Sequence, residues 1–212
     1  NVMSFSGHKS IACISNQVGA VVIGKERQIK FALTCLLGGG HLLIEDVQGV
    51  GKTTLSHALA ISLGLDFSRM QFTSDMLPSD VLGASIFNSK TMQFEFIPGP
   101  IFSQVLLADE INRASPKTQS AMLEAMEERQ VTVDGKSRKL PDIFFVIATQ
   151  NPQHQIGTHA LPESQLDRFM MKISIGYPEP EAEINLLMGD NGREMLQQLK
   201  PVISFADLSR LR

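Results

Sequence analysis

Glu45-Asp46-Val47-Gln48-Gly49-Val50-Gly51-Lys52-Thr53-Thr54 is the stretch of this chain with the most specific structural meaning. The apolar residues 41–44 before it predict a buried strand, and residues 55–63 after it predict a helix with an apolar face. A strand, a glycine-rich turn and a helix that opens with Gly-Lys-Thr together are typical of the phosphate-binding loop of nucleotide hydrolases. The strict form of that motif has glycine at the position that Asp46 occupies here.

Each residue type in this loop suits a phosphate group. Glycines at positions 49 and 51 let the backbone curl so that several N–H groups point at one anion. The helix N-terminus adds its positive dipole end, Lys52 adds a point charge, and the hydroxyl of Thr53 is a ligand for magnesium. The predicted nucleotide contacts in the loop are therefore Gln48, Gly49, Val50, Gly51, Lys52, Thr53 and Thr54.

The composition is that of an ordinary globular protein. The 212 residues are 43% hydrophobic and 19% charged, and the formal net charge is −3, which gives no support to nonspecific nucleic-acid binding. Cys13 and Cys35 lie in apolar helical contexts and are expected to be buried free thiols of a reducing compartment. The five histidines show no metal-ligand spacing, and no apolar run is long enough to cross a membrane. No secretion signal is evident at the N-terminus, so a cytoplasmic location is expected.

Strands and helices are predicted to alternate along the chain, which favours an α/β fold with a largely parallel sheet covered on both faces. Besides the strand and helix that flank the loop, helices are expected over residues 10–20, 25–37 and 116–128, with Ser115 as N-cap of the last. Further strands are expected over residues 69–72, 105–108, 143–149 and 171–175. Residues 130–140 predict a hairpin around Asp134-Gly135, and residues 162–168 predict a short helix.

Carboxylates follow one of these strands directly. Residues 105–108 are apolar and Asp109 and Glu110 come next. Ligands of parallel sheets bind at the carboxyl ends of the strands, so both acids are expected to lie near Lys52. Asp109 suits the magnesium shell through water, and Glu110 suits orienting and deprotonating an attacking water molecule.

Two other segments fit the same site. Asn151 follows the apolar strand 143–149 and is predicted to contact the terminal phosphate or the water near Glu110. Asn151-Pro152 is also an ordinary turn signal. The functional interpretation of Asn151 therefore depends on the polar residues that follow the other strands. The connector Val22-Ile23-Gly24 has room to lie against a flat ligand and is predicted to form the wall for the nucleotide base.

Arg168 ends the stretch Leu161–Arg168, and the residues alone leave two interpretations open. One is a surface arginine paired with Asp167, a kind of contact that contributes little. The other is an arginine finger supplied to the nucleotide of a neighbouring subunit. Arg113, just after the two carboxylates, is a second candidate for an interface role.

Taken together, these motifs closely resemble those of the MoxR-type AAA+ ATPases, over about residues 21–178. The resemblance rests on Val22-Ile23-Gly24, the loop 45–53, Asp109-Glu110-Ile111-Asn112-Arg113-Ala114, residues 123–128, Ala148–Pro152 and Leu161–Phe169. Gln48 departs from the proline usual at that point of the family's loop.

The resemblance implies a three-layer P-loop NTPase (AAA+) fold with a five-stranded parallel sheet. It also implies a β-hairpin insertion over residues 82–98, with Ser89-Lys90 near its turn. By analogy, such hairpins line a central pore or face a client. A C-terminal helical lid normally follows in the family and is expected to be largely absent, giving an AAA+ domain over residues 1–178 and a linker with the start of a lid over residues 179–212.

The family pattern implies roles for the residues that match it. Lys52, Glu110, Asn151 and Arg168 would be catalytic, with Arg168 as the finger, while Thr53 and Asp109 would hold Mg²⁺ and ATP or ADP would be the ligand. The function implied is an ATP-driven remodelling chaperone that works as a ring, expected to be a hexamer. Its client would be a partner protein, possibly one with a von Willebrand A-like domain. The alternatives are a nucleic-acid motor of the helicase type, which the near-neutral charge disfavours, and a nucleotide-gated binding module with little turnover.

Overall fold

A computed structural model of the chain describes residues 7–45, 51–151, 157–174 and 191–212. Five parallel strands form the central sheet in the order β2-β5-β8-β1-β9: β2 Phe67–Gln71, β5 Val105–Asp109, β8 Phe145–Gln150, β1 Leu42–Glu45 and β9 Met171–Ile173. The predicted five-stranded parallel sheet is thus confirmed. The predicted strand 171–175 is described as far as residue 173, and its last residue lies outside the described part.

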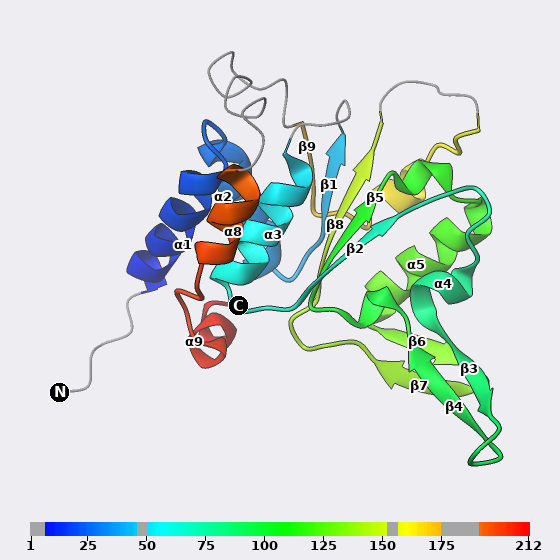
Figure 1. The fold of residues 1–212 in the computed structure, drawn as a ribbon. Coiled ribbons are helices and arrows are strands. Elements are labelled where there is room, and N and C mark those ends of the chain that lie inside the picture. The colour runs from blue at the N-terminus through cyan, green and yellow to red at the C-terminus, as the bar shows by residue number, and fades with distance from the viewer. Residues whose placement is uncertain (1–6, 46–50, 152–156, 175–190) are drawn as a thin grey trace.

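Helices cover both faces of this sheet, which makes three layers (Figure 1). One face carries α1 Gly7–Val21, α2 Glu26–Leu37 and α3 Lys52–Ser62, and α8 Asn191–Gln198 and α9 Phe205–Leu211 pack beside them. The other face carries α4 Pro78–Leu82 and α5 Pro116–Glu128, while α6 Glu163–Leu166 leads towards β9. Ser115 caps α5 as predicted, because its hydroxyl accepts a hydrogen bond from the N–H of Thr118 at 3.4 Å.

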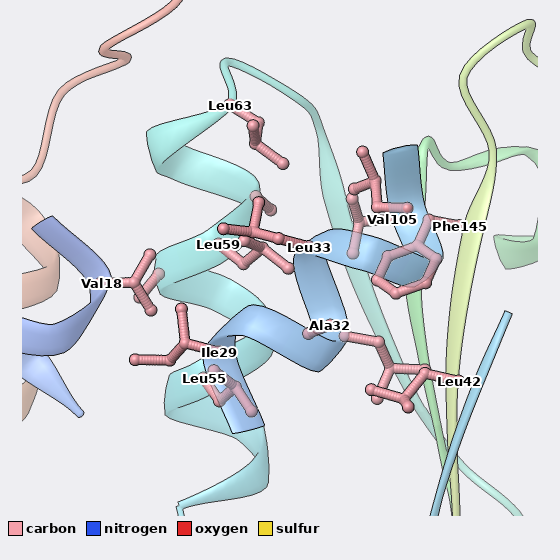
Figure 2. Close-up of a cluster of buried hydrophobic side chains, with 14 of the residues drawn as sticks. Val18, Ile29, Ala32, Leu33, Leu42, Leu55, Leu59, Leu63, Val105 and Phe145 are labelled. Carbon is pink, nitrogen blue, oxygen red and sulfur yellow. The ribbon is translucent and has the colours of Figure 1, made fainter. Parts of the chain in front are cut away.

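The alternation of side chains along each strand sorts the core into two clusters. Leu42 and Ile44 of β1 face α2 and α3, together with Val105, Leu107, Phe145 and Ile147 of the neighbouring strands. Figure 2 shows this cluster, in which Ile29 and Leu33 of α2 lie beside Leu55 and Leu59 of α3. Leu43, Leu106, Ala108 and Val146 face the opposite way and pack against α5 and α4. The side of the sheet on which a polar residue lies can therefore be read from its position in its strand.

Two antiparallel hairpins extend from the α5 side (Figure 1). β3 Gly83–Asn88 pairs with β4 Gln93–Pro98, which confirms the predicted insertion, with Ser89 and Lys90 in the turn. β6 Gln130–Val133 pairs with β7 Lys136–Lys139 around the predicted Asp134-Gly135 turn, where both residues have positive φ. The guanidinium of Arg138 on β7 stacks over the ring of Phe96 on β4, 3.8 Å from its centroid, so the two hairpins contact each other.

The C-terminal helices pack onto the first face of the sheet. Leu208 of α9 is fully buried in the core cluster, and Val202 donates its N–H to the carbonyl of Ser62 at 2.9 Å. The side chain of Gln17 on α1 donates to Lys200 and to Ser62. The division of the chain at residue 178 into two domains stays a prediction.

One prediction about the core is wrong. Cys35 is buried as expected, but Cys13 is exposed. Cys13 is on the outer side of α1, whose buried residues are Ile14 and Val18, one turn apart. Burial raises the pKa of the Cys35 thiol to about 11.

Candidate functional site

Helix α3 begins where the phosphate-binding loop was predicted to end. Gly51 is its N-cap, with φ of +74°, and a side chain built there would meet no atom within 4 Å. The carbonyl of Gly51 accepts the N–H of Leu55 at 2.9 Å, so the first helical turn starts at Lys52 and contains Thr53 and Thr54. The N–H groups of such a first turn point out of the helix end, where an anion is favoured. Gln48, Gly49 and Val50, the other predicted loop contacts, lie outside the described residues.

Strand parity places Asp109 on the same side of the sheet as α3. Val105 and Leu107 of β5 belong to the core cluster under α3, and Asp109 is the next residue with that orientation. Thr149 of β8 follows Phe145 and Ile147 in the same way and is fully buried. Asp109 and Thr149 therefore lie on the side of the sheet that α3 covers. The closeness of both acids to Lys52 stays a prediction.

Asp109 is held by side chains from both neighbouring strands. The hydroxyl of Thr149 on β8 donates to Oδ1 of Asp109 at 2.5 Å. Nη2 of Arg69 on β2 donates to Oδ2 of the same carboxylate at 2.8 Å. Each carboxylate oxygen of the predicted magnesium residue thus accepts a hydrogen bond from the protein.

Glu110 leaves the strand by a sharp turn. Its backbone is left-handed, with φ of +54° and ψ of +52°, and its N–H donates to the hydroxyl of Thr149 at 2.8 Å. Its carboxylate is paired with Arg113 across 3.0 Å in the short 3₁₀ helix Ile111–Arg113. The left-handed turn costs energy in a residue other than glycine, and the Thr149 bond helps to hold it.

Hydrogen bonds from two buried amide side chains, Asn112 and Gln119, connect this turn to the residues that follow β8. Nδ2 of Asn112 reaches the carbonyl of Asn151 at 3.5 Å, and the carbonyl of Asn112 accepts the N–H of His159 at 2.6 Å. Nε2 of Gln119 donates to the carbonyls of Ile111, Ala114 and His159 at 3.0 to 3.1 Å. The side chain of Asn112 therefore links the backbone of Asn151 to the 3₁₀ helix that follows Glu110.

Side-chain contacts also join the carboxyl ends of β1, β8 and β9. Glu45, the last residue of β1, forms an ion pair with Lys172 of β9 and accepts a hydrogen bond from Nε2 of Gln150 at 3.2 Å. These contacts link three strand ends immediately before the predicted phosphate-binding loop.

The predicted wall for the nucleotide base lies between α1 and α2. Val22 is buried, whereas the side chain of Ile23 is 58% exposed and Gly24 has φ of +76°. A hollow of about 470 Å³ opens nearby between α2 and β9, lined by Arg27, Gln28, Phe31 and residues 171–174. Among the described residues, Ile23 does not line this hollow.

Arg168 does not pair with Asp167, which corrects one of the two interpretations of this residue. It forms an ion pair with Glu127 of α5, and its Nη1 donates to the carbonyl of Leu123 at 3.3 Å. Asp167 instead ends α6, its N–H bonded to the carbonyl of Glu163. Arg168 therefore lies on the α5 side of the molecule, with its side chain 32% exposed.

The match of this chain to a known family covers the strand ends and the predicted phosphate-binding loop. Residues 41–171 match the model of the family described as ATPases associated with various cellular activities (AAA). The chain belongs to the AAA family. The matched range runs from the residue before β1 to the first residue of β9, so the loop, both carboxylates, Asn151 and Arg168 all lie inside it.

Relatives of this AAA protein confirm the MoxR-type resemblance. Chaperone MoxR1 of Mycobacterium tuberculosis is 42% identical over 92% of this chain, and the uncharacterized protein YeaC of Bacillus subtilis is 52% identical over 94%. A solved structure of an ATPase candidate from Cytophaga hutchinsonii superposes with a TM-score of 0.85 over 96% of this chain, at 42% identity. The chain spans 52% of the length of MoxR1 and 62% of the other two proteins.

Two residues of this site were missed by sequence reasoning. Thr149 had a usable signal, since it lies two positions before Asn151 at the end of the same apolar strand. Arg69 had none, because only the strand order places β2 beside β5. In the described ranges no group of three or more His, Cys, Asp or Glu residues could hold a metal ion, and no helix there could span a membrane.

Proposed function

We propose that this chain is the ATP-binding and ATP-hydrolysing part of a MoxR-type AAA+ chaperone. The observation that carries the proposal is the position of Asp109, which lies on the side of the sheet that α3 covers and is joined to Glu110 through the hydroxyl of Thr149. Membership in the AAA family and the similarity to MoxR1 support the choice of ATP. The substrates, partners and activity of the protein are part of this proposal.

In this proposal the residues divide the work by position. Gly51, Lys52, Thr53 and Thr54 bind the phosphates at the start of α3, and Val22, Ile23 and Gly24 contact the base. Glu110 orients and deprotonates the attacking water, while Asn151 senses the terminal phosphate. Thr149 acts through its two hydrogen bonds, which fix the positions of both acids.

The residues present fit a magnesium ion that arrives with the nucleotide. Asp109 and Thr53 both offer oxygen atoms, which are the ligands that Mg²⁺ prefers. When bound, the ion would neutralise phosphate charge during hydrolysis. Because each oxygen of Asp109 already accepts a hydrogen bond, contact through water suits this carboxylate better than direct ligation.

We assign Arg168 to a neighbouring subunit's nucleotide in a ring, expected to be a hexamer. Support comes from its position: it is partly exposed, on the α5 side, with its guanidinium held by Glu127 and the carbonyl of Leu123. Arg113, which is paired with Glu110, is the alternative finger. A client protein, possibly with a von Willebrand A-like domain, and a cytoplasmic location complete the proposal.

The rate of ATP hydrolysis at increasing protein concentration tests this function. The expected result is a specific activity that rises with concentration and falls by about 10³-fold in Arg168→Ala, the size of known arginine-finger effects. Arg113→Ala tests the other candidate, and Arg210→Ala, an exposed ion-paired arginine on α9, is the matched control.

Two outcomes would contradict the proposal in different ways. Nucleotide binding without turnover at any concentration would favour the nucleotide-gated binding module. Hydrolysis stimulated by DNA with steep salt dependence would favour the nucleic-acid motor.

A further inference from the structure

Arg69 forms an ion pair with the residue expected to serve magnesium. It lies on β2, where the register pairs it with Leu107 of β5. Leu107 faces α3, so the side chain of Arg69 is on that side of the sheet too. Asp109 lies two residues after Leu107 and faces the same way. Its Nη2 lies 2.8 Å from Oδ2 of Asp109. No motif marked this residue in the sequence.

The two partners differ in their surroundings. The side chain of Asp109 is 17% exposed, whereas that of Arg69 is 49% exposed. Asp109 is also fixed by Thr149 from the other neighbouring strand. The aspartate is thus the stationary partner, and a half-exposed arginine on a long side chain can leave it at a small cost.

We propose that Arg69 is a built-in counter-ion of Asp109 that competes with magnesium. This rests on the proposed function, because it takes Asp109 as the carboxylate that the ion approaches. Two positive charges near one carboxylate repel each other, so Asp109 would attract a magnesium ion, even through water, more weakly while Arg69 is bonded to Oδ2. Arg69 therefore raises the magnesium concentration at which the nucleotide site fills.

The ion pair also has a use when the site is empty. A carboxylate that is mostly shielded from water and left without a cation is costly. Arg69 supplies that cation from an adjacent strand and keeps Asp109 oriented towards α3. The same contact that stabilises the empty site thereby opposes the metal.

Magnesium titrations of nucleotide binding test the competition without relying on turnover. The parent carries Glu110→Gln, so that a fluorescent ATP analogue stays intact, and the midpoint in Mg²⁺ is compared with that of the same chain carrying Arg69→Met. We expect the midpoint to fall about threefold, within the range that partly exposed ion pairs give. Arg69→Lys keeps the charge and is expected to stay nearer the parent. Arg138→Met makes the same change on β7 and is the matched control.

The outcomes separate this inference from the proposed function. A midpoint in Arg69→Met that equals or exceeds the parent's overturns the counter-ion role. Failure of the parent to bind the analogue at saturating Mg²⁺ overturns the proposed function instead. Thermal unfolding without magnesium checks folding, and Arg69→Gln replaces the Met variant if that one unfolds early.

Discussion

The two ends of the same parallel strands hold polar groups in contrasting ways. At the amino end, the buried imidazole of His41 accepts the N–H of Val146 at Nδ1, 3.0 Å away. Arg129 donates to the carbonyl of Gly39 at 2.5 Å, and Arg212 donates to that of Asp142 at 2.7 Å. At the carboxyl end, Asp109 and Glu110 are paired mainly with other side chains, Arg69, Thr149 and Arg113.

This difference teaches how to separate structural from functional polar residues in this fold. The amino-end side chains bond to backbone groups that the strands and their loops hold in place, so these contacts contribute to stability. Side-chain partners can rotate away and admit a ligand, so the carboxyl-end contacts are suited to function. The predictions below set residues of the two ends against each other.

Glu110→Gln is expected to have the largest effect. Removing a general base lowers turnover by about 10²- to 10⁴-fold, while the amide occupies the same space. ATP hydrolysis and nucleotide binding measured on the same sample should therefore separate, with binding retained. Full activity in this variant would disprove the assignment of the base. His41→Gln, at the other end of the strands, should keep its turnover at pH 7.

His41 is expected to make stability depend on pH. Burial lowers its pKa to about 4, with repulsion from Arg129 and Arg212 adding to the effect and a hydrogen bond to the carbonyl of Met126 acting against it. The unfolded chain takes up this proton below about pH 6.5, whereas the folded protein does so only near pH 4. Stability is therefore full above pH 6.5 and lost as the pH falls towards 4.

Urea unfolding at pH 7 and pH 5 measures this loss. His41 alone should account for about 2 kcal/mol between the two values. His41→Gln removes that part of the dependence, so the variant should lose less on acidification than the parent. Equal losses in both proteins would show that His41 is not buried in its neutral form.

Thr149→Val tests whether the carboxyl end also contributes to stability. The change keeps the shape but leaves Oδ1 of Asp109 and the N–H of Glu110 without their partner. We expect a loss of about 1–3 kcal/mol in the free energy of unfolding, together with lower turnover. In the control Thr132→Val, the hydroxyl that is lost bonds to that of Ser137 on the exposed hairpin, so the change should cost under about 0.5 kcal/mol. Comparable costs for the two valines would remove the special role of Thr149.

Arg129→Gln is expected to have the smallest effect. Since burial is the larger cause of the low pKa of His41 and Arg129 the second, the variant should raise that pKa without restoring it to 6.5. An NMR titration of the imidazole measures the change, and Arg210→Gln on α9 is the control. An unchanged pKa would mean that solvent screens Arg129 fully from the ring.

Much of this fold follows from local sequence patterns. The apolar runs predicted β1, β5 and β8, and their final polar residues predicted which strand ends meet. Ser115 and Asp134-Gly135 identified a helix start and a hairpin turn, because these structures depend on a few adjacent residues. The roles of the site residues stay predictions until they are tested.

What could not be predicted depends on the order of strands and the rotation of helices. Arg69 and Asp109 are 40 residues apart in the chain. They meet only because β2 is the neighbour of β5 in the sheet. Arg168 is paired with Glu127 because α5 runs past the end of α6, which no spacing in the sequence specifies. Cys13 was misplaced because its position depends on the rotation of α1 about its axis.

The strand order also has a consequence for how the protein folds. β1 pairs with β8, so that Leu42 lies beside Ile147, and β2 and β5 lie between them in the chain. Contacts so distant in sequence form slowly, because a long loop must close before they bring any gain. The proposed nucleotide-binding edge is therefore complete only once β1 lies beside β8. We expect nucleotide to stabilise the completed sheet and to have little effect on the early steps of folding.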